Sequence, residues 1–243
     1  MFAWIQRWRQ SRLMKRPLPP DCYDWLSQHV PFFPGLKGEV RERFLDYLKA
    51  FAFSKHFIGA GGLELTDEHR FVISAAAVRL VLHLDLSYYD RLTEIIVYPY
   101  IYRHPDRTGA ILGEAQQWGT VVLSWPAVLQ GMANPEDGHD TALHEFAHVL
   151  DVADGSFDGT PELHRFGDYR SWARIMSREF LELRNEAGHP RAVLREYGAT
   201  DEAEFFAVAS EAFFETPRQI KEKAPELYNE LQKFYRVDPL SNQ

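Results

Sequence analysis

The sequence predicts an α+β fold that is mainly helical, and two observations lead to this prediction. Apolar residues recur at three- and four-residue steps along much of the 243-residue chain, as in amphipathic helices that face a core. Two short apolar runs between residues 93 and 125 instead have the length of β-strands, and each is stopped by a proline. We therefore expect a small sheet among many helices.

The N-terminal residues 1–20 are expected to form a basic arm. The first sixteen positions carry five basic side chains and no acidic one, and they lack the uninterrupted apolar stretch of a signal peptide. Tryptophans alternate with arginines here, which suits a helix that binds a membrane surface or a partner. The alternative is a helical tail packed on the body. Three prolines at positions 17, 19 and 20 end the arm, and we expect residues 21–243 to form a single domain.

The helices and strands of this domain follow from local patterns. Residues 35–53 carry an apolar stripe at helical spacing, and Thr66 is a predicted N-cap for the next helix, which includes residues 71–84. The two apolar runs, EIIVYP at 94–99 and GTVVLSW at 119–125, are the predicted strands. Further helices are predicted over 168–187, from residue 201 to Pro217, and in the C-terminal tail.

Composition excludes several classes of function. A formal charge of −8 argues against a nucleic-acid partner, because phosphate binding requires a concentrated basic surface. Cys22 is the only cysteine, so the chain has no internal disulfide and no thiolate zinc cluster. No stretch of twenty apolar residues predicts a transmembrane segment. We expect a cytoplasmic protein in which histidines and carboxylates hold any metal.

The segment TALHEFAHVLD carries the clearest chemical pattern. On a helix, His144 and His148 stand on one face four residues apart, so that both imidazoles can bind one cation. Glu145 is then placed beside the ion, where it can act as the base that activates water. Apolar neighbours predict a buried helix, and burying this polar trio without a cation would be costly. The alternative is a surface helix with incidental histidines.

A catalytic zinc ion has three protein ligands and one open position, so a third ligand is required. One class of such enzymes places it ten residues after the first histidine, here Asp154, but Asp151 replaces the glycine that makes the necessary turn. Another class draws a glutamate from a later helix. Glu204 and Glu211 lie seven residues apart and share a helical face, and periodicity does not choose between them.

Two segments resemble a known family. The pieces HEFAHVLD and YGATDEAEFFAVASEAFF are similar to the Mlc titration factor A family of bacterial zinc peptidases, and the resemblance extends to both predicted strands and to KFYRVDPL. It covers the chain from about residue 20 to the end. The same two pieces also resemble the catalytic domain of anthrax lethal factor. The resemblance implies a zincin-like metallopeptidase domain, with a small mixed β-sheet packed beside the active-site helix.

The family resemblance also implies roles for individual residues. The third zinc ligand falls on Glu204, which leaves Glu211 to orient a ligand, and the catalytic tyrosine falls on Tyr197. A phenol at this place can donate a hydrogen bond to the oxyanion of the reaction. The family further implies one zinc ion per chain, small peptide-like substrates with aminopeptidase character, and binding of the repressor called Mlc.

Two features near the motif have open interpretations. Asp151 returns to the face of His148 and either accepts a hydrogen bond from a ligand histidine or caps the helix end together with Asp154. The strand at 119–125 precedes the motif, as the substrate-aligning edge strand does in zinc peptidases of this type. A peptide could add to such an edge through backbone hydrogen bonds, although a wholly structural strand is also compatible.

The predicted function is zinc-dependent peptide hydrolysis. Glu145 acts as general base and passes the proton to the leaving amine, while Tyr197 stabilises the oxyanion. The alternative is a regulatory protein that sequesters a transcriptional repressor of the Mlc type, with the zinc structural. An intact Glu145 favours the peptidase, since a purely structural site has no use for a base.

Overall fold

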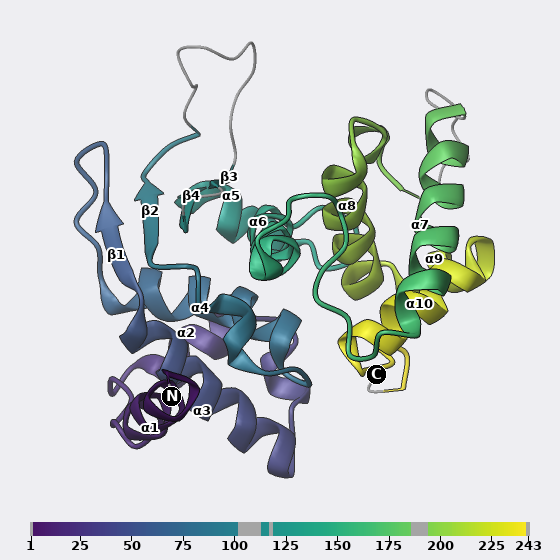
Figure 1. Cartoon of the computed structure of the whole chain (residues 1–243). Helices are drawn as coiled ribbons and strands as arrows, with labels where there is room; N and C mark the ends of the chain where they lie inside the picture. Colours follow the sequence, from purple (N-terminus) through teal and green to yellow (C-terminus); the bar gives the residue numbers. More distant parts are fainter. Residues whose placement is uncertain (1, 102–112, 117–118, 186–193, 242–243) are drawn as a thin grey trace.

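The computed structural model describes residues 2–101, 113–116, 119–185 and 194–241, and it confirms a mainly helical α+β fold (Figure 1). The helices are α1 (Phe2–Met14), α2 (Cys22–His29), α3 (Gly38–Ser54), α4 (Asp67–Val81), α5 (Trp125–Ala133), α6 (Thr141–Asp151), α7 (Asp168–Asn185), α8 (Glu202–Glu215), α9 (Pro217–Lys223) and α10 (Pro225–Tyr235). Short 3-10 turns are η1 (Phe33–Gly35), η2 (Leu86–Tyr89), η3 (Val152–Asp154) and η4 (Glu196–Ala199). The predicted helices are therefore confirmed, and residues 186 and 187 of the helix predicted over 168–187 lie outside the described residues.

The sheet is small and mixed, as predicted. Its strands are β1 (His56–Gly59), β2 (Glu94–Tyr98), β3 (Gly113–Gln116) and β4 (Thr120–Ser124), in the spatial order β1-β2-β4-β3. β1, β2 and β4 run parallel, and β3 pairs antiparallel with β4. The sequence predicted β2 and β4, whose buried valines, isoleucines and leucines give a strand signal, but it did not predict the other two.

The expectation that the strand at 119–125 is a substrate-aligning edge is wrong. β4 is hydrogen-bonded on both sides, to β2 through Val121 opposite Ile95 and to β3 through Val121 opposite Ala115. Its backbone groups are therefore already paired, and the outer position in the sheet belongs to β3. The polar sequence GEAQ of β3 has no alternation that would have identified it as a strand.

Helix α4 forms the central support of the fold. It begins at the predicted cap: the Thr66 hydroxyl accepts a hydrogen bond from the His69 amide, and His69 Nδ1 accepts one from the Thr66 amide. From Phe71 to Val81 almost every residue is buried, because α4 packs against α2, α3 and α6. The helix that carries the HEFAH motif therefore rests on an apolar support.

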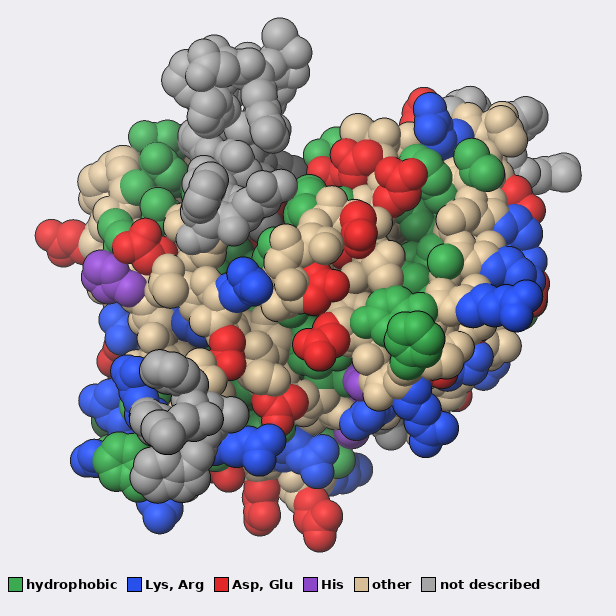
Figure 2. Space-filling view, in the orientation of Figure 1, with side chains coloured by type: hydrophobic (Ala, Val, Ile, Leu, Met, Phe, Trp, Pro, Cys, Tyr) green, Lys and Arg blue, Asp and Glu red, His purple; other side chains and the backbone are tan. Residues whose placement is uncertain are grey.

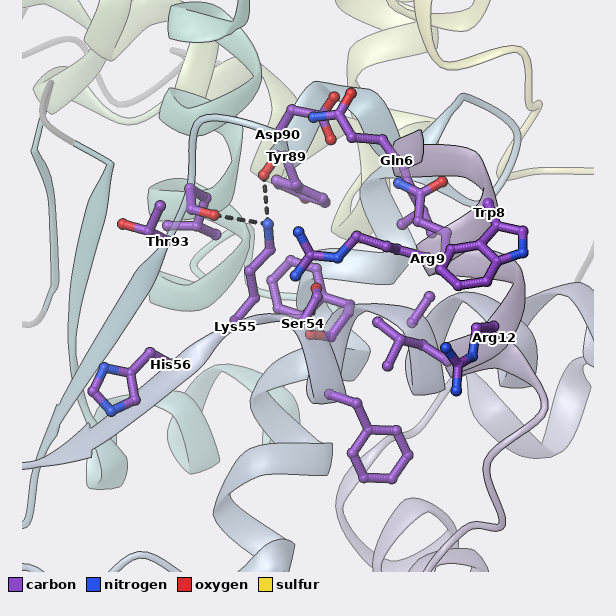
Figure 3. Close-up of a pocket in the computed structure, with 17 residues that line it drawn as sticks. Gln6, Trp8, Arg9, Arg12, Ser54, Lys55, His56, Tyr89, Asp90 and Thr93 are labelled. Atoms are coloured by element: carbon purple, nitrogen blue, oxygen red, sulfur yellow. Dashed lines mark hydrogen bonds between the residues drawn. The ribbon is translucent and has the colours of Figure 1, made fainter. Parts of the chain in front are cut away.

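The N-terminal helix α1 packs against α3, which agrees with a tail that lies on the body. A cavity of about 630 Å³ lies between the arm and the end of α3 (Figure 3). There the Lys55 ammonium donates to the carbonyl oxygens of Tyr89 and Leu92, and burial lowers the pKa of Lys55 to about 8. In the described part of the chain, no helix is long and apolar enough to cross a membrane. The division into an arm over 1–20 and one domain over 21–243 stays a prediction.

The C-terminal helices α7 to α10 form the other side of the molecule, with α6 between them and the sheet (Figure 1). Aromatic rings join these helices: Trp172 of α7 and Phe206 of α8 both contact Phe234 of α10. Phe213 and Tyr235 stack within the same buried layer. This packing fixes α8 beside α6, where the candidate site lies.

Candidate metal centre

Helix α6 holds His144, Glu145 and His148 in the interior. The side chain of Asp140 caps its N-terminus by accepting hydrogen bonds from the amides of Ala142 and Leu143, at 2.9 and 3.0 Å. Every residue of α6 is buried, since the helix has α4 on one side and α8 on another. The polar trio of the motif is therefore almost withdrawn from water, as the apolar neighbours in the sequence predicted.

Helix α8 brings Glu204 to the same place. Its N-cap is Asp201, whose side chain accepts a hydrogen bond from the Glu204 amide at 2.9 Å. Glu204 thus lies in the first turn of α8, and the close packing of α8 on α6 directs its carboxylate to the two imidazoles. The two N-caps fix where α6 and α8 begin, and therefore how far along each helix axis the three side chains lie.

Three side-chain atoms converge at this point. His144 Nε2 lies 3.1 Å from His148 Nε2, and Glu204 Oε2 lies 3.0 Å from the first nitrogen and 3.4 Å from the second. Tetrahedral ligands with bonds of about 2.0–2.1 Å are about 3.3–3.4 Å apart, so these spacings are close to those of a zinc site. Within the described residues, His144, His148 and Glu204 are the group of three potential ligands that could hold one metal ion.

The partners of these atoms also fit a cation. Glu204 Oε2 is buried and makes no hydrogen bond of good geometry in the described part of the chain, although both imidazoles are close. Burial alone would raise the pKa of Glu204, but the neighbouring His144 and His148 lower it well below its usual range. Burial would lower the pKa of His144, but Glu204 and Glu211 raise it to about 10. The cluster thus favours an extra positive charge, which a metal ion would supply in place of a proton.

Glu211 contacts the opposite nitrogen of His144. Its Oε1 atom accepts a hydrogen bond from His144 Nδ1 at 2.7 Å, and its Oε2 atom accepts one from the Asp140 amide at 2.9 Å. The guanidinium of Arg195 forms an ion pair with the same carboxylate. With Nδ1 holding the proton, Nε2 of His144 is free to point its lone pair at a metal. Glu211 therefore has the geometry of a residue that orients a ligand.

Two members of this network were not found from the sequence. Asp140 directly precedes the motif helix and has the ordinary signature of an N-cap, so the sequence carried a signal for it. Arg195 carried none, because a single arginine before Tyr197 has no distinguishing pattern, and only the tertiary structure brings it to Glu211.

Tyr197 lies at the entrance of the site. It belongs to η4, and its hydroxyl donates a hydrogen bond to Glu204 Oε1 at 3.1 Å. The centre of its ring is 5.8 Å from that of His144, and 51% of the residue is exposed to solvent. The phenol is thus close enough to the three converging atoms to reach a group bound there.

Asp151 and Asp154 lie outside the cluster of three. Asp151 is fully buried, and its Oδ2 atom accepts a hydrogen bond from the Gly159 amide at 3.0 Å instead of one from His148 Nδ1. Gly159 has a φ of +76°, and a Cβ there would lie 2.2 Å from the carbonyl oxygen of Glu202. Asp151 therefore fixes the loop that crosses the start of α8. Asp154 is exposed and accepts a hydrogen bond from the Ser156 amide.

The surface around the site is acidic. Figure 2 shows Asp and Glu side chains gathered over the middle of one face, while Lys and Arg lie mainly toward its edges. The segments that border the site contribute exposed carboxylates: Asp154, Asp158, Glu196, Asp201 and Glu202. Such a surface attracts cationic groups and repels anionic ones, so it favours ligands that carry a positive charge where they meet this surface.

Comparisons with known proteins agree with this geometry. The chain is 35% identical to the uncharacterized protein slr2042 of Synechocystis, over 98% of this chain and 91% of that protein. It is 30% identical to Mlc titration factor A of Pectobacterium atrosepticum, over 87% of this chain and 84% of the relative. For Mlc titration factor A of Klebsiella pneumoniae the identity is 27% over the same shares. The model of the glucose-regulated metallo-peptidase M90 family matches residues 5–236. This chain therefore belongs to the M90 metallopeptidase family.

Proposed function

We propose that this protein is a zinc-dependent peptidase in which His144, His148 and Glu204 hold one zinc ion. The observation that carries the proposal is the convergence of three ligand atoms, 3.0 to 3.4 Å apart, two of them from the helix α6 that also carries Glu145 and the third from α8. Zinc prefers such a set of two imidazoles and one carboxylate, with an open fourth position. When bound, zinc would polarise the scissile carbonyl and lower the pKa of a water molecule toward neutrality.

The side chains of this chain would divide the remaining work. The Glu145 carboxylate accepts the proton of the attacking water and then delivers it to the departing amine. Tyr197 exchanges its hydrogen bond to Glu204 for one to the oxygen that becomes negative in the transition state. Glu211, held by Arg195 and by the Asp140 amide, keeps His144 in the tautomer that binds metal.

The acidic surroundings support the aminopeptidase character within this proposal. The free amino terminus of a peptide carries a positive charge, and the segments that follow α6 and begin α8 carry the exposed carboxylates of Asp154, Asp158 and Glu202. The outer strand β3 offers backbone groups along which an extended peptide can align. A peptide with an acetylated amino terminus should therefore be hydrolysed more slowly than the same peptide with a free one.

Replacing Glu145 with Gln tests the peptidase mechanism. The variant should keep its zinc, because Glu145 is not among the converging ligands, and it should lose peptide hydrolysis by about 10²–10⁴-fold. Zinc content is measured by elemental analysis and hydrolysis with short peptides. Glu222→Gln, an exposed residue of α9, serves as the matched control and should remain active. Undiminished hydrolysis by Glu145→Gln would remove Glu145 from the mechanism.

A second candidate function is regulatory, and the name of the relatives favours it. Several similar proteins are called Mlc titration factor A, so we include binding of an Mlc-type repressor as the alternative. A cytoplasmic place of action is part of the proposal for either function. A pull-down of such a repressor by Glu145→Gln separates the two functions. Retained binding with lost hydrolysis would show that the two functions are independent. Absence of binding in the unmodified chain would contradict the regulatory role.

A further inference from the structure

A second cavity, of about 760 Å³, lies at the N-terminal end of the candidate metal helix. Its walls come from the segment around residues 31–40, the end of α4, the end of α5, the C-terminal end of α8 and residues near Val237. Much of the lining is apolar and includes Leu36, Val40 and Met132. Its size lies within the range of pockets that hold small organic ligands, about 300–1,000 Å³.

Glu215 lines this cavity, and the burial of its carboxyl group is unfavourable for the stability of the fold. The residue is 4% exposed, and neither carboxylate oxygen has a hydrogen-bond partner in the described part of the chain. A buried polar group without a partner costs about 1–3 kcal/mol. Glu215 is also the last residue of α8, where the helix dipole disfavours a negative charge. Stability of the fold therefore gives no reason for a glutamate at this position.

The buried charges around the cavity do not balance, whereas the exposed Lys37 and Glu136 of its lining carry opposite charges. Asp140 is 1% exposed, and its Oδ1 atom caps α6 while its Oδ2 atom has no partner among the described residues. Arg79 forms no ion pair within 4.0 Å with either of these described carboxylates, and its charge acts on both only from a greater distance. Its guanidinium donates to the Phe214 carbonyl oxygen and lies over the rings of Phe32 and Phe214. Two buried carboxylates thus face one internal cation, which is already engaged with a carbonyl and two aromatic rings.

We propose that this cavity binds a small organic cation, an amine or guanidinium on an apolar body. The cationic group pairs with Glu215 and with Oδ2 of Asp140, which supplies the partners that the fold leaves out. The apolar body contacts Leu36, Val40 and Met132. A metal ion fits less well, because no group of three ligand side chains occurs here within the described residues. The site does not depend on hydrolysis at the zinc centre.

Titration calorimetry with hexylguanidinium tests this site, and hexylurea provides a neutral molecule of nearly the same shape. Burial raises the pKa of Glu215 to about 8, so the titration is made at about pH 8.5, where the carboxylate carries its charge more fully. We expect hexylguanidinium to bind at least about tenfold more tightly than hexylurea, and Glu215→Gln to lose about tenfold in affinity for the cation alone.

Three further variants make the outcome decisive. Glu222→Gln removes an exposed carboxylate outside the cavity, and Glu204→Ala removes a proposed zinc ligand, so both should bind hexylguanidinium as the unmodified chain does. Val40→Phe narrows the cavity and should weaken the binding of both probes. This variant tests the site without altering Glu215. Equal affinity for the two probes would overturn the proposal. So would a loss in Glu204→Ala without one in Glu215→Gln, since the probe would then occupy the zinc centre.

Discussion

At the scale of single residues, two glutamates of α8 contact opposite nitrogens of one imidazole. Glu204 lies next to His144 Nε2, and Glu211 receives the hydrogen bond of His144 Nδ1. They are seven residues apart and equivalent in helical periodicity, so the pattern of apolar residues did not separate them. Their positions along α8 relative to α6 decide which nitrogen each one meets. That relative height is a property of packing between helices.

The different contacts of the two glutamates predict different losses of metal. Glu204→Ala removes a proposed ligand and should abolish stoichiometric zinc binding, whereas Glu211→Ala leaves the three proposed ligands in place and should weaken zinc binding by about 10–100-fold. Elemental analysis after dialysis, followed by competition with a chelator, measures both effects. If zinc were lost only in Glu211→Ala, the third ligand would be Glu211 and the assignment to Glu204 would be wrong.

The buried carboxyl of Glu215 predicts a pH-dependent stability. Burial, and next the charge of Asp140, raise its pKa from 4.5 to about 8 in the folded chain. Between these values the folded chain keeps a proton that the unfolded chain has lost, so the stability of the protein falls as the pH rises from 4.5 to about 8. Glu215→Gln has no such titration and should be more stable by about 2–4 kcal/mol near pH 8.

Urea unfolding at a series of pH values measures this difference. The free energies of unfolding of Glu215→Gln and of the unmodified chain should coincide near pH 4.5 and diverge as the pH approaches 8. Glu222→Gln, which changes an exposed side chain, should follow the unmodified chain throughout. A constant offset at all pH values would mean that Glu215 keeps an ordinary pKa in the folded protein.

At the scale of elements, the strongest sequence signals gave correct predictions. The cap at Thr66 and the apolar stripes predicted α3, α4, α7 and α8, because a helix that buries one face carries its period in the sequence. The strands β1 and β3 were missed. Each has four residues, and β3 is polar, so both are strands through their pairing with β2 and β4 and not through their composition.

The N-cap of α6 predicts a coupled loss of stability and metal affinity. Asp140→Ala removes the hydrogen bonds to the amides of Ala142 and Leu143 and should cost about 0.5–2 kcal/mol in the free energy of unfolding. It should also weaken zinc binding, since α6 carries both histidines. Asp140→Asn keeps an acceptor at the cap and should lose less on both measures. Equal losses for the two variants in urea unfolding and zinc titration would argue against the cap as the cause.

At the scale of the whole molecule, the proposed zinc ion joins the two halves of the fold. His144 and His148 belong to α6 on the side of the sheet, while Glu204 belongs to α8, which packs with the C-terminal helices (Figure 1). An ion bound between them stabilises the folded state over the unfolded state, by about 4 kcal/mol when zinc is a thousandfold above its dissociation constant.

Removal of zinc should therefore lower the thermal midpoint. Calorimetric scans with and without a chelator should show a midpoint several degrees lower in the chelated sample, and addition of zinc should restore it. Glu204→Ala should melt at the same temperature in both conditions, because it lacks one of the three proposed ligands. A chelator effect of equal size in that variant would place the stabilising metal elsewhere.

The sequence by itself determined the class of fold, the HEFAH helix and the chemistry that its residue types allow, because these depend on spacing along one helix. Its resemblance to a family directed attention to Glu204 and Tyr197. Only the tertiary structure decided which strand lies at the edge of the sheet, which nitrogen of His144 each glutamate meets, and that Arg195 and Asp140 hold Glu211. These contacts join segments far apart in the chain, and their distances follow from how helices pack, which no local pattern encodes.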